Sequence, residues 1–329
     1  MQRNDFTRQC LKSWTSNTLL PRRWFAQQAK TDFWTLGGGT RALFQDAARI
    51  GPVPLPDFCR MSGRVLGHQV QKIQTAQAGK MDYDKTFEIR GKQYKYAVET
   101  YPHVLETELQ TAVAMCALKP GETMLNIPAA CVSLGSYVPD SVTYVERESN
   151  AAFAALTGTP YGRLDNTGLA DGSVDVIVSV ASLHHATDEE RRVFYHECHR
   201  ILRKGGNGRL VIGDVRRGSP QDTWLNEFVN AMNSSGHVGR FWDMEPCGRD
   251  FQLLEACGFQ VSANIQHYDW TFSSVAAMLD FVRNLFGLDL AKDDAALLTA
   301  IQSHLGFNVD AKDGSVRFPW ELAYFVATT

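Results

Sequence analysis

Short apolar runs alternate with amphipathic segments from about residue 101 onward, and this alternation constrains the fold more than any other feature. Continuous apolar runs, typical of strands covered on both faces, lie at 123–127, 142–145, 174–180 and 208–214. Helical segments separate them at 104–118, 150–156 and 189–202. Strands joined by right-handed helical crossovers form a doubly wound, mostly parallel α/β sheet. Such sheets bind ligands at the carboxyl ends of their strands.

The C-terminal part extends this pattern with two further strands and several helices. We expect helices at 222–232, 251–256, 274–286 and 294–305, and strands at 259–265 and 317–327. The segment at about 270–315 would then form a helical cap over the sheet edge. We predict one domain over residues 104–329, preceded by an N-terminal extension, residues 1–103, with helical character and no assigned fold.

Charge and composition limit the kinds of molecule that this protein is expected to bind. The 329 residues carry a formal net charge of −3 and no dense block of Lys or Arg, which argues against nucleic acid and membrane surfaces. The N-terminus lacks a secretory pattern and no apolar run could span a bilayer, so we expect a cytoplasmic protein. The seven cysteines include no CxxC pair, so neither a disulfide framework nor a zinc cluster is indicated. A small-molecule substrate is expected, with a homodimer or a partner subunit also open.

The stretch 169–215 resembles the middle of class I S-adenosylmethionine-dependent methyltransferases that act on small molecules. The residues that carry the resemblance are Asp171-Gly172-Ser173 with Asp175, Ser182-Leu183-His184-His185, 202–206, Gly236-His237 and Pro319-Trp320-Glu321-Leu322. It covers about 104–329. The resemblance implies a Rossmann-like fold with a seven-stranded sheet, S-adenosylmethionine as cofactor, and methyl transfer to a small, partly apolar metabolite.

The resemblance also implies a set of cofactor-binding residues, at Asn126, Ala129, Glu146, Asp165 and Ser182. In the family an acid ends the first strand and glycines follow it, whereas this chain has Asn126 and then a loop, 127–132, without glycine. Glu146 stands where the family binds the ribose hydroxyls. The helix after the loop is expected to have lost about one turn. The cofactor half of the sheet has therefore diverged more than the other half.

Three histidines near the strand ends are candidate catalytic bases. His184 and His185 follow the fourth family strand and His237 lies in a later loop, so one of them could deprotonate an acceptor. The alternative is that they pack under a helix or line the pocket. His196 and His199 share a helix face, but a solvated outer face explains them better, and no metal site is predicted.

Aromatic residues outside the predicted sheet are candidate substrate-binding groups, because ligand pockets are lined mainly by apolar and aromatic side chains. The candidates are Tyr96, Tyr101, Trp224 and Trp242. Three uses of the fold stay open: methyl transfer, a non-methylation reaction such as cyclisation, elimination or rearrangement in a pocket that has lost normal cofactor binding, and a non-catalytic partner subunit.

Overall fold

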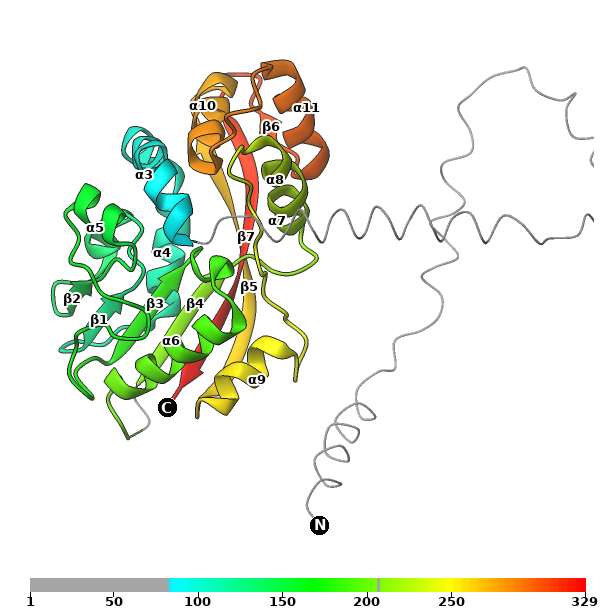
Figure 1. The fold of residues 1–329 in the computed structure, drawn as a ribbon. Coiled ribbons are helices and arrows are strands. Elements are labelled where there is room, and N and C mark those ends of the chain that lie inside the picture. The colour runs from blue at the N-terminus through cyan, green and yellow to red at the C-terminus, as the bar shows by residue number, and fades with distance from the viewer. Residues whose placement is uncertain (1–82, 206–207) are drawn as a thin grey trace, which may run out of the picture. The chain divides into compact units, whose positions relative to one another are not determined.

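A computed structural model describes residues 83–205 and 208–329, which form a seven-stranded sheet covered by helices on both faces (Figure 1). Its strands are β1 (Thr123–Asn126), β2 (Thr143–Glu146), β3 (Val176–Val180), β4 (Arg209–Asp214), β5 (Gln260–Phe272), β6 (Asn308–Val309) and β7 (Val316–Thr328). The order is β2-β1-β3-β4-β7-β5, with β6 paired to β7. Strands β2, β1, β3 and β4 are parallel, while β7 runs antiparallel to β4 and β5. The predicted α/β class and mostly parallel sheet are confirmed, and the predicted extension before residue 83 lies outside the described residues.

The helices fall close to the predicted segments. They are α3 (Tyr83–Thr100), α4 (Glu106–Met115), α5 (Ala151–Thr157), α6 (Asp188–Ile201), α7 (Pro220–Thr223), α8 (Asn230–Met232), α9 (Arg249–Ala256), α10 (Val275–Phe286) and α11 (Asp294–His304), with a π-helical turn, η5 (Trp224–Val229), between α7 and α8. Side-chain caps set several starts: Asn150, Ser274 and Asp293 each accept a backbone N–H of the first turn. After β1, however, only a 3-10 turn, η3 (Gly135–Tyr137), is present where we expected a shortened helix.

Successive strand residues face opposite layers of the core. Met124 and Val211 pack with α4, whereas Leu125 and Leu210 pack with α6 and α9 on the other face. All four side chains are fully buried. Continuous apolar runs are required because both faces of these strands are covered.

Strands β5 and β7 form a ribbon of 13 paired residues each, longer than the other strands. The predicted strand at 259–265 was therefore too short. The additional residues of β5 are not a continuous apolar run. Tyr268, Trp270 and Phe272 are buried and alternate with exposed residues, which is the period of a strand buried on one face. Trp270 stacks on Trp320 across the ribbon at a centroid distance of 4.2 Å.

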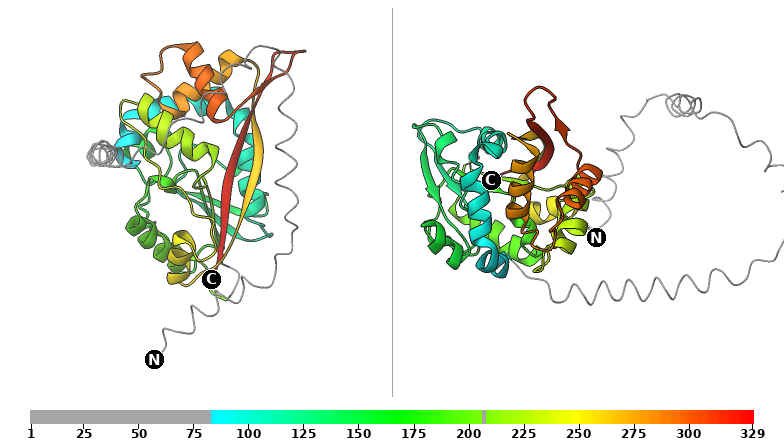
Figure 2. Two further views of the ribbon diagram at one scale, coloured as in Figure 1. Left: turned by 90° about the vertical axis from the view of Figure 1, so that its right-hand side faces the viewer. Right: turned by 90° about the horizontal axis from the view of Figure 1, so that it is seen from above.

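Helix α3, in the region left without a fold, lies across the carboxyl end of the sheet (Figure 1). Thr86, Arg90, Tyr94 and Ala97 recur at helical spacing and form its inner face. The helix packs against α5 and α10, and α3 and α10 lie side by side when viewed from above (Figure 2). It thereby closes the space above the strand ends.

Membrane-spanning helices were not expected. Among residues 83–205 and 208–329, no helix combines the length and the apolar character needed to cross a bilayer.

Candidate functional site

Two neighbouring cavities lie at the carboxyl ends of the parallel strands. The outer cavity has a volume of about 420 Å³ and opens beside β1, β3 and the start of α6. The inner cavity, about 100 Å³, lies beneath α3 between β3, β4 and the β5–β7 ribbon. Ser182 and His185 line both. A ligand in one cavity would therefore lie next to a ligand in the other.

His184 is fixed by the last residue of β4. Its Nδ1 lies 2.8 Å from Asp214 Oδ1, and its backbone N–H donates to Asp214 Oδ2 at 3.0 Å. Asp214 is fully buried. Although burial opposes ionisation, the contacts with His184 and the backbone N–H of Val215 hold the pKa of Asp214 below its usual value. A carboxylate on Nδ1 fixes the ring and leaves Nε2 for other chemistry.

His185 and His237 complete a group of three histidines. The ring centroids of His184 and His237 are 5.4 Å apart, and those of His185 and His237 are 5.0 Å apart. Burial, and then the charge of neighbouring cationic groups, lowers the pKa of both His185 and His237 well below 6.5. The structure thus brings together the three histidines that the sequence proposed separately.

Glu108 of α4 places a carboxyl group in the same cavity. It is 5% exposed, and its Oε2 accepts hydrogen bonds from Tyr268 Oη at 3.0 Å and Trp270 Nε1 at 3.2 Å. Burial raises the pKa of Glu108 to about 7, although the two hydrogen bonds oppose the shift. A carboxyl group that titrates near neutral pH is suited to accept and return a proton.

Arg90 of α3 supplies the positive charge of the inner cavity. Its Nη2 donates to the Leu285 carbonyl at 2.9 Å, whereas its buried Nε has no hydrogen-bond partner among the described residues. No carboxylate in the described part of the chain forms an ion pair with it. Burial lowers the pKa of Arg90 to about 10, so it stays charged near neutral pH. A buried guanidinium with an unused donor is suited to bind an anionic or carbonyl oxygen.

The remaining wall of the inner cavity is apolar. It comprises Phe87, Leu105, Ala130, Val215, Leu225, Trp270, Leu285, Phe286 and Trp320, with Tyr94 at its edge. Sequence reasoning missed Glu108 and Arg90. A detectable signal was present, because Glu108 shares a helix face with the buried Leu105 and Ala112, where an acidic residue is unexpected.

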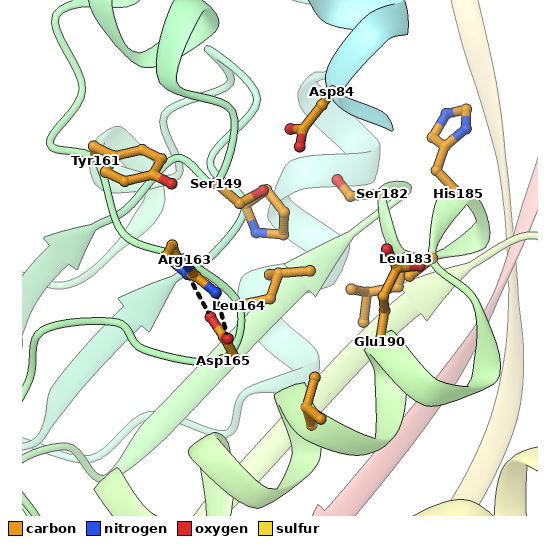
Figure 3. A pocket seen from close by; sticks show the side chains of 13 residues that line it. Asp84, Ser149, Tyr161, Arg163, Leu164, Asp165, Ser182, Leu183, His185 and Glu190 are labelled. Carbon is orange, nitrogen blue, oxygen red and sulfur yellow. Dashed lines mark hydrogen bonds and ion pairs between the residues drawn. The ribbon is translucent and has the colours of Figure 1, made fainter. Parts of the chain in front are cut away.

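The outer cavity is more polar and is drawn in Figure 3. Two predicted cofactor residues, Asp165 and Ser182, line it, together with Ser149. Asp165 forms two hydrogen bonds with Arg163, at 2.7 and 2.6 Å, and both side chains are exposed. Ser182 Oγ donates to the Val180 carbonyl at 2.7 Å.

The other predicted cofactor residues, Asn126, Ala129 and Glu146, lie outside this cavity, and Asn126 and Glu146 are joined by hydrogen bonds through a tyrosine. Asn126 Nδ2 donates to Tyr144 Oη at 3.2 Å, and Tyr144 Oη donates to Glu146 Oε1 at 2.5 Å. Glu146 and Asp165 line different cavities. The predicted set is therefore split, and Asn126 is joined to Glu146 through a tyrosine.

The loop after β1 lies directly against the chain that follows β2. The N–H of Ala129 donates to the Arg147 carbonyl at 2.9 Å, and the N–H of Ala130 donates to Glu148 Oε2 at 2.8 Å. Glu148 is fully buried, and its Oε1 accepts the N–H of Asn150 at 2.7 Å. The amides of Ala129 and Ala130 are thus bonded within the protein itself.

The four predicted substrate-binding aromatics lie away from both cavities. Tyr96 and Tyr101 donate to Asp280 of α10, at 3.3 and 2.8 Å, and so connect α3 and its C-terminal end to the cap. Trp224 is fully buried and stacks on Phe228.

Trp242 is also fully buried, on the opposite face of the sheet. The Arg191 guanidinium lies 4.4 Å from its ring centroid, and Arg191 forms a buried ion pair with Asp250. Trp242 therefore contributes to the core that supports α6 and α9.

Sequence comparison matches residues 137–210 to the profile of a methyltransferase domain. This match and the observed sheet confirm the predicted resemblance to the class I methyltransferase superfamily. A search of curated proteins found no match.

Three solved structures similar to this chain are two proteins described as methyltransferases and one described as a cyclase. An S-adenosylmethionine-dependent methyltransferase from Thermotoga maritima is 18% identical, covering 74% of this chain and 98% of its own, with a TM-score of 0.45. A protein from Bacillus halodurans assigned to the methyltransferases is 16% identical over 68% and 98%, with a TM-score of 0.47. The cyclase SpnF is 14% identical over 73% and 94%, with a TM-score of 0.43.

Proposed function

We propose that this protein is an enzyme that catalyses proton transfer on a small, apolar molecule bearing a carbonyl or carboxylate group, in the inner cavity. The observation that supports this most is that Glu108 and Arg90 both line one largely apolar cavity. The reaction class is a rearrangement, cyclisation or elimination that begins with loss of a proton next to a carbonyl group.

The chain's own residues divide the work. The Arg90 guanidinium binds the carbonyl oxygen, and the ring of Trp270 and its neighbours hold the apolar body. Glu108 takes the proton from the adjacent carbon. The electrons of the broken C–H bond pass to the carbonyl oxygen, where the charge of Arg90 stabilises them. Glu108 then returns the proton to another carbon, or the electron pair expels a leaving group.

The size of the cavity limits the substrate. The inner cavity, at about 100 Å³, is smaller than the outer cavity, at about 420 Å³. Only a short molecule fits entirely inside, so a larger substrate would extend past Ser182 and His185 into the outer cavity.

Hydrogen–deuterium exchange into a panel of small molecules tests the proposal for any substrate of this class. The full chain is incubated in D₂O with short-chain ketones, enones and the corresponding carboxylic acids, and deuterium in each compound is measured by mass spectrometry. We expect enzyme-dependent incorporation that is lost in E108Q and kept in E106Q, since Glu106 is exposed on the same helix. Equal incorporation with wild type and E108Q throughout the panel would contradict the proposal.

S-adenosylmethionine-dependent methyl transfer to a small, partly apolar metabolite is the second candidate. The match at 137–210 and the outer cavity with Asp165 and Ser182 favour it. On this alternative His185, which lines both cavities, would orient or deprotonate the acceptor. Turnover that is unchanged in H185A would eliminate that role. Calorimetry with S-adenosylmethionine separates the two candidates.

A further inference from the structure

The three histidines of the inner cavity are the one group of side chains with metal-ligating geometry found in the described residues. Their candidate ligand atoms all lie within 4.8 Å of one another. We propose that His184, His185 and His237 bind one divalent transition-metal ion, with Zn²⁺ the best match, and leave one coordination position open to the inner cavity. Binding of the ion is argued from the three histidines alone. Only the role of the ion in catalysis rests on the proposed function.

The first support is the partner of His184. Histidines that bind metals usually donate their second ring N–H to a carboxylate or a carbonyl group, which fixes the ring and strengthens the ligand. Asp214 provides this contact at Nδ1, 2.8 Å away. Nε2 of His184 is then the atom left to bind the ion.

The second support is an unsatisfied nitrogen on His237. The residue is 8% exposed, and its buried Nδ1 has no hydrogen-bond partner among the described residues. Leaving a buried polar atom unpaired is destabilising. A metal ion would satisfy this nitrogen.

The ligand set selects the ion. Three imidazoles suit Zn²⁺ and similar borderline ions, whereas Mg²⁺ and Ca²⁺ prefer oxygen. Catalytic zinc sites characteristically have three protein ligands and one open position. Tetrahedral binding at about 2.1 Å would require nitrogens about 3.4 Å apart, so the three rings must approach one another slightly on binding.

The charges around the cluster are compatible with a dication. The Asp214 carboxylate touches His184, and Glu108 adds a second negative charge when ionised. The Arg90 guanidinium in the same cavity and Arg240 beside His185 oppose the ion. When bound, such an ion polarises a carbonyl oxygen or a water molecule at its open position.

Metal titration of the full chain tests the site directly. Protein treated with EDTA and dialysed is titrated with Zn²⁺ by calorimetry, and with Co²⁺ followed by its visible absorption bands. We expect one ion per chain. H185Q and H237Q should weaken binding by more than about 100-fold, and D214N by about 10- to 100-fold, because Asp214 acts only through His184. H196Q is the matched control, since His196 is exposed on α6.

Two results would overturn the proposal. One is absence of Zn²⁺ and Co²⁺ binding by the wild type, and the other is binding by H185Q and H237Q as tight as that of the wild type. Circular dichroism identifies variants that fail to fold, and H185Q alone suffices if H237Q does not fold. Binding without deuterium exchange supports the metal site and contradicts the proposed function. Exchange by protein that binds no metal contradicts the site and leaves the function standing.

Discussion

At the carboxyl end of the sheet, the part at β1 and β2 and the part at β3 and β4 differ in how fully their buried polar groups are hydrogen-bonded. At β1 and β2 the loop amides of Ala129 and Ala130 are bonded to the neighbouring chain, and Asn126 is joined to Glu146 through Tyr144. At β3 and β4 the inner cavity instead leaves polar atoms of Arg90 and His237 unsatisfied. The amides of the loop after β1 are thus bonded internally, whereas Arg90 and His237 in the inner cavity each keep a nitrogen without a hydrogen-bond partner among the described residues.

The loop after β1 is held at a conformational cost. Ala130 and Cys131 have φ values of 47° and 55°, in the left-handed region that glycine would adopt more easily. The buried Glu148 carboxylate stabilises this conformation by accepting the N–H of Ala130. In this loop without glycine, the left-handed conformation is thus supported by an internal contact.

The largest expected effect concerns Glu108, the proposed proton-transfer group of the inner cavity. Because Glu108 must be ionised to accept a proton, the exchange rate should rise with pH up to about 7 and then level off. At pH 5 it should be about 100-fold lower than at the plateau, since the ionised fraction falls tenfold per unit. E108Q should lower the plateau by about 10²- to 10⁴-fold. A rate independent of pH between 5 and 8 in the wild type would remove Glu108 from this role.

The free energy of unfolding should also depend on pH through the carboxyl group of Glu108. Its pKa is raised in the folded state, so its contribution is fully present below pH 4.5 and is lost as pH rises through about 7. The loss amounts to about 3 kcal/mol, because the pKa of Glu108 rises from 4.5 to about 7 on folding. In urea unfolding of EDTA-treated protein between pH 4.5 and 8, the stability of the wild type relative to E108Q should fall by this amount, since the lowered pKa values of His185 and His237 affect both proteins alike. Parallel pH curves for the two proteins would argue against a buried, neutral Glu108.

Binding of a carbonyl or carboxylate ligand should depend on Arg90. R90Q should weaken binding of any compound that exchanges deuterium by about tenfold to thirtyfold, since a hydrogen bond to a charged group contributes about 1.5–2 kcal/mol. Calorimetry measures the effect, with K92Q, exposed on the same helix, as the control. An affinity equal to that of K92Q would place the ligand elsewhere.

The smallest expected effect is that of Glu148, beside the loop after β1, on the free energy of unfolding. E148Q replaces one of two accepting oxygens by an NH₂ group that faces a backbone N–H, so the free energy of unfolding should fall by about 1–1.5 kcal/mol. E99Q, on the exposed side of α3, should change it by less than about 0.5 kcal/mol. If E148Q is as stable as E99Q, the contacts of Glu148 do not hold the loop.

The sequence predicted most of the sheet because its central strands are buried on both faces. Met124 and Leu125 face opposite layers, so the run that contains them is apolar without interruption. Helix α3 was missed because its inner face is partly polar, with Thr86 and Arg90 directed to a cavity rather than to an apolar core. The extension of β5 was missed because only alternate residues are buried.

The candidate site was predicted in part. His184 and His185 are adjacent in sequence, but only the fold brings His237 to them, and no sequence spacing encodes that approach. The closure of the cofactor loop depends on a long-range contact between Ala130 and Glu148. Missing glycines indicated a changed loop without showing what fills it.

We propose that the inner cavity carries the chemistry and that the loop after β1, bonded to its neighbouring chain, does not take up S-adenosylmethionine. Calorimetry and thermal unfolding of the full chain with millimolar S-adenosylmethionine and S-adenosylhomocysteine test this. The closed loop predicts no heat of binding and no change in unfolding temperature with either compound. Binding would stabilise the protein, by about 2.7 kcal/mol at 100 times the dissociation constant. Such stabilisation would contradict the claim and favour methyl transfer.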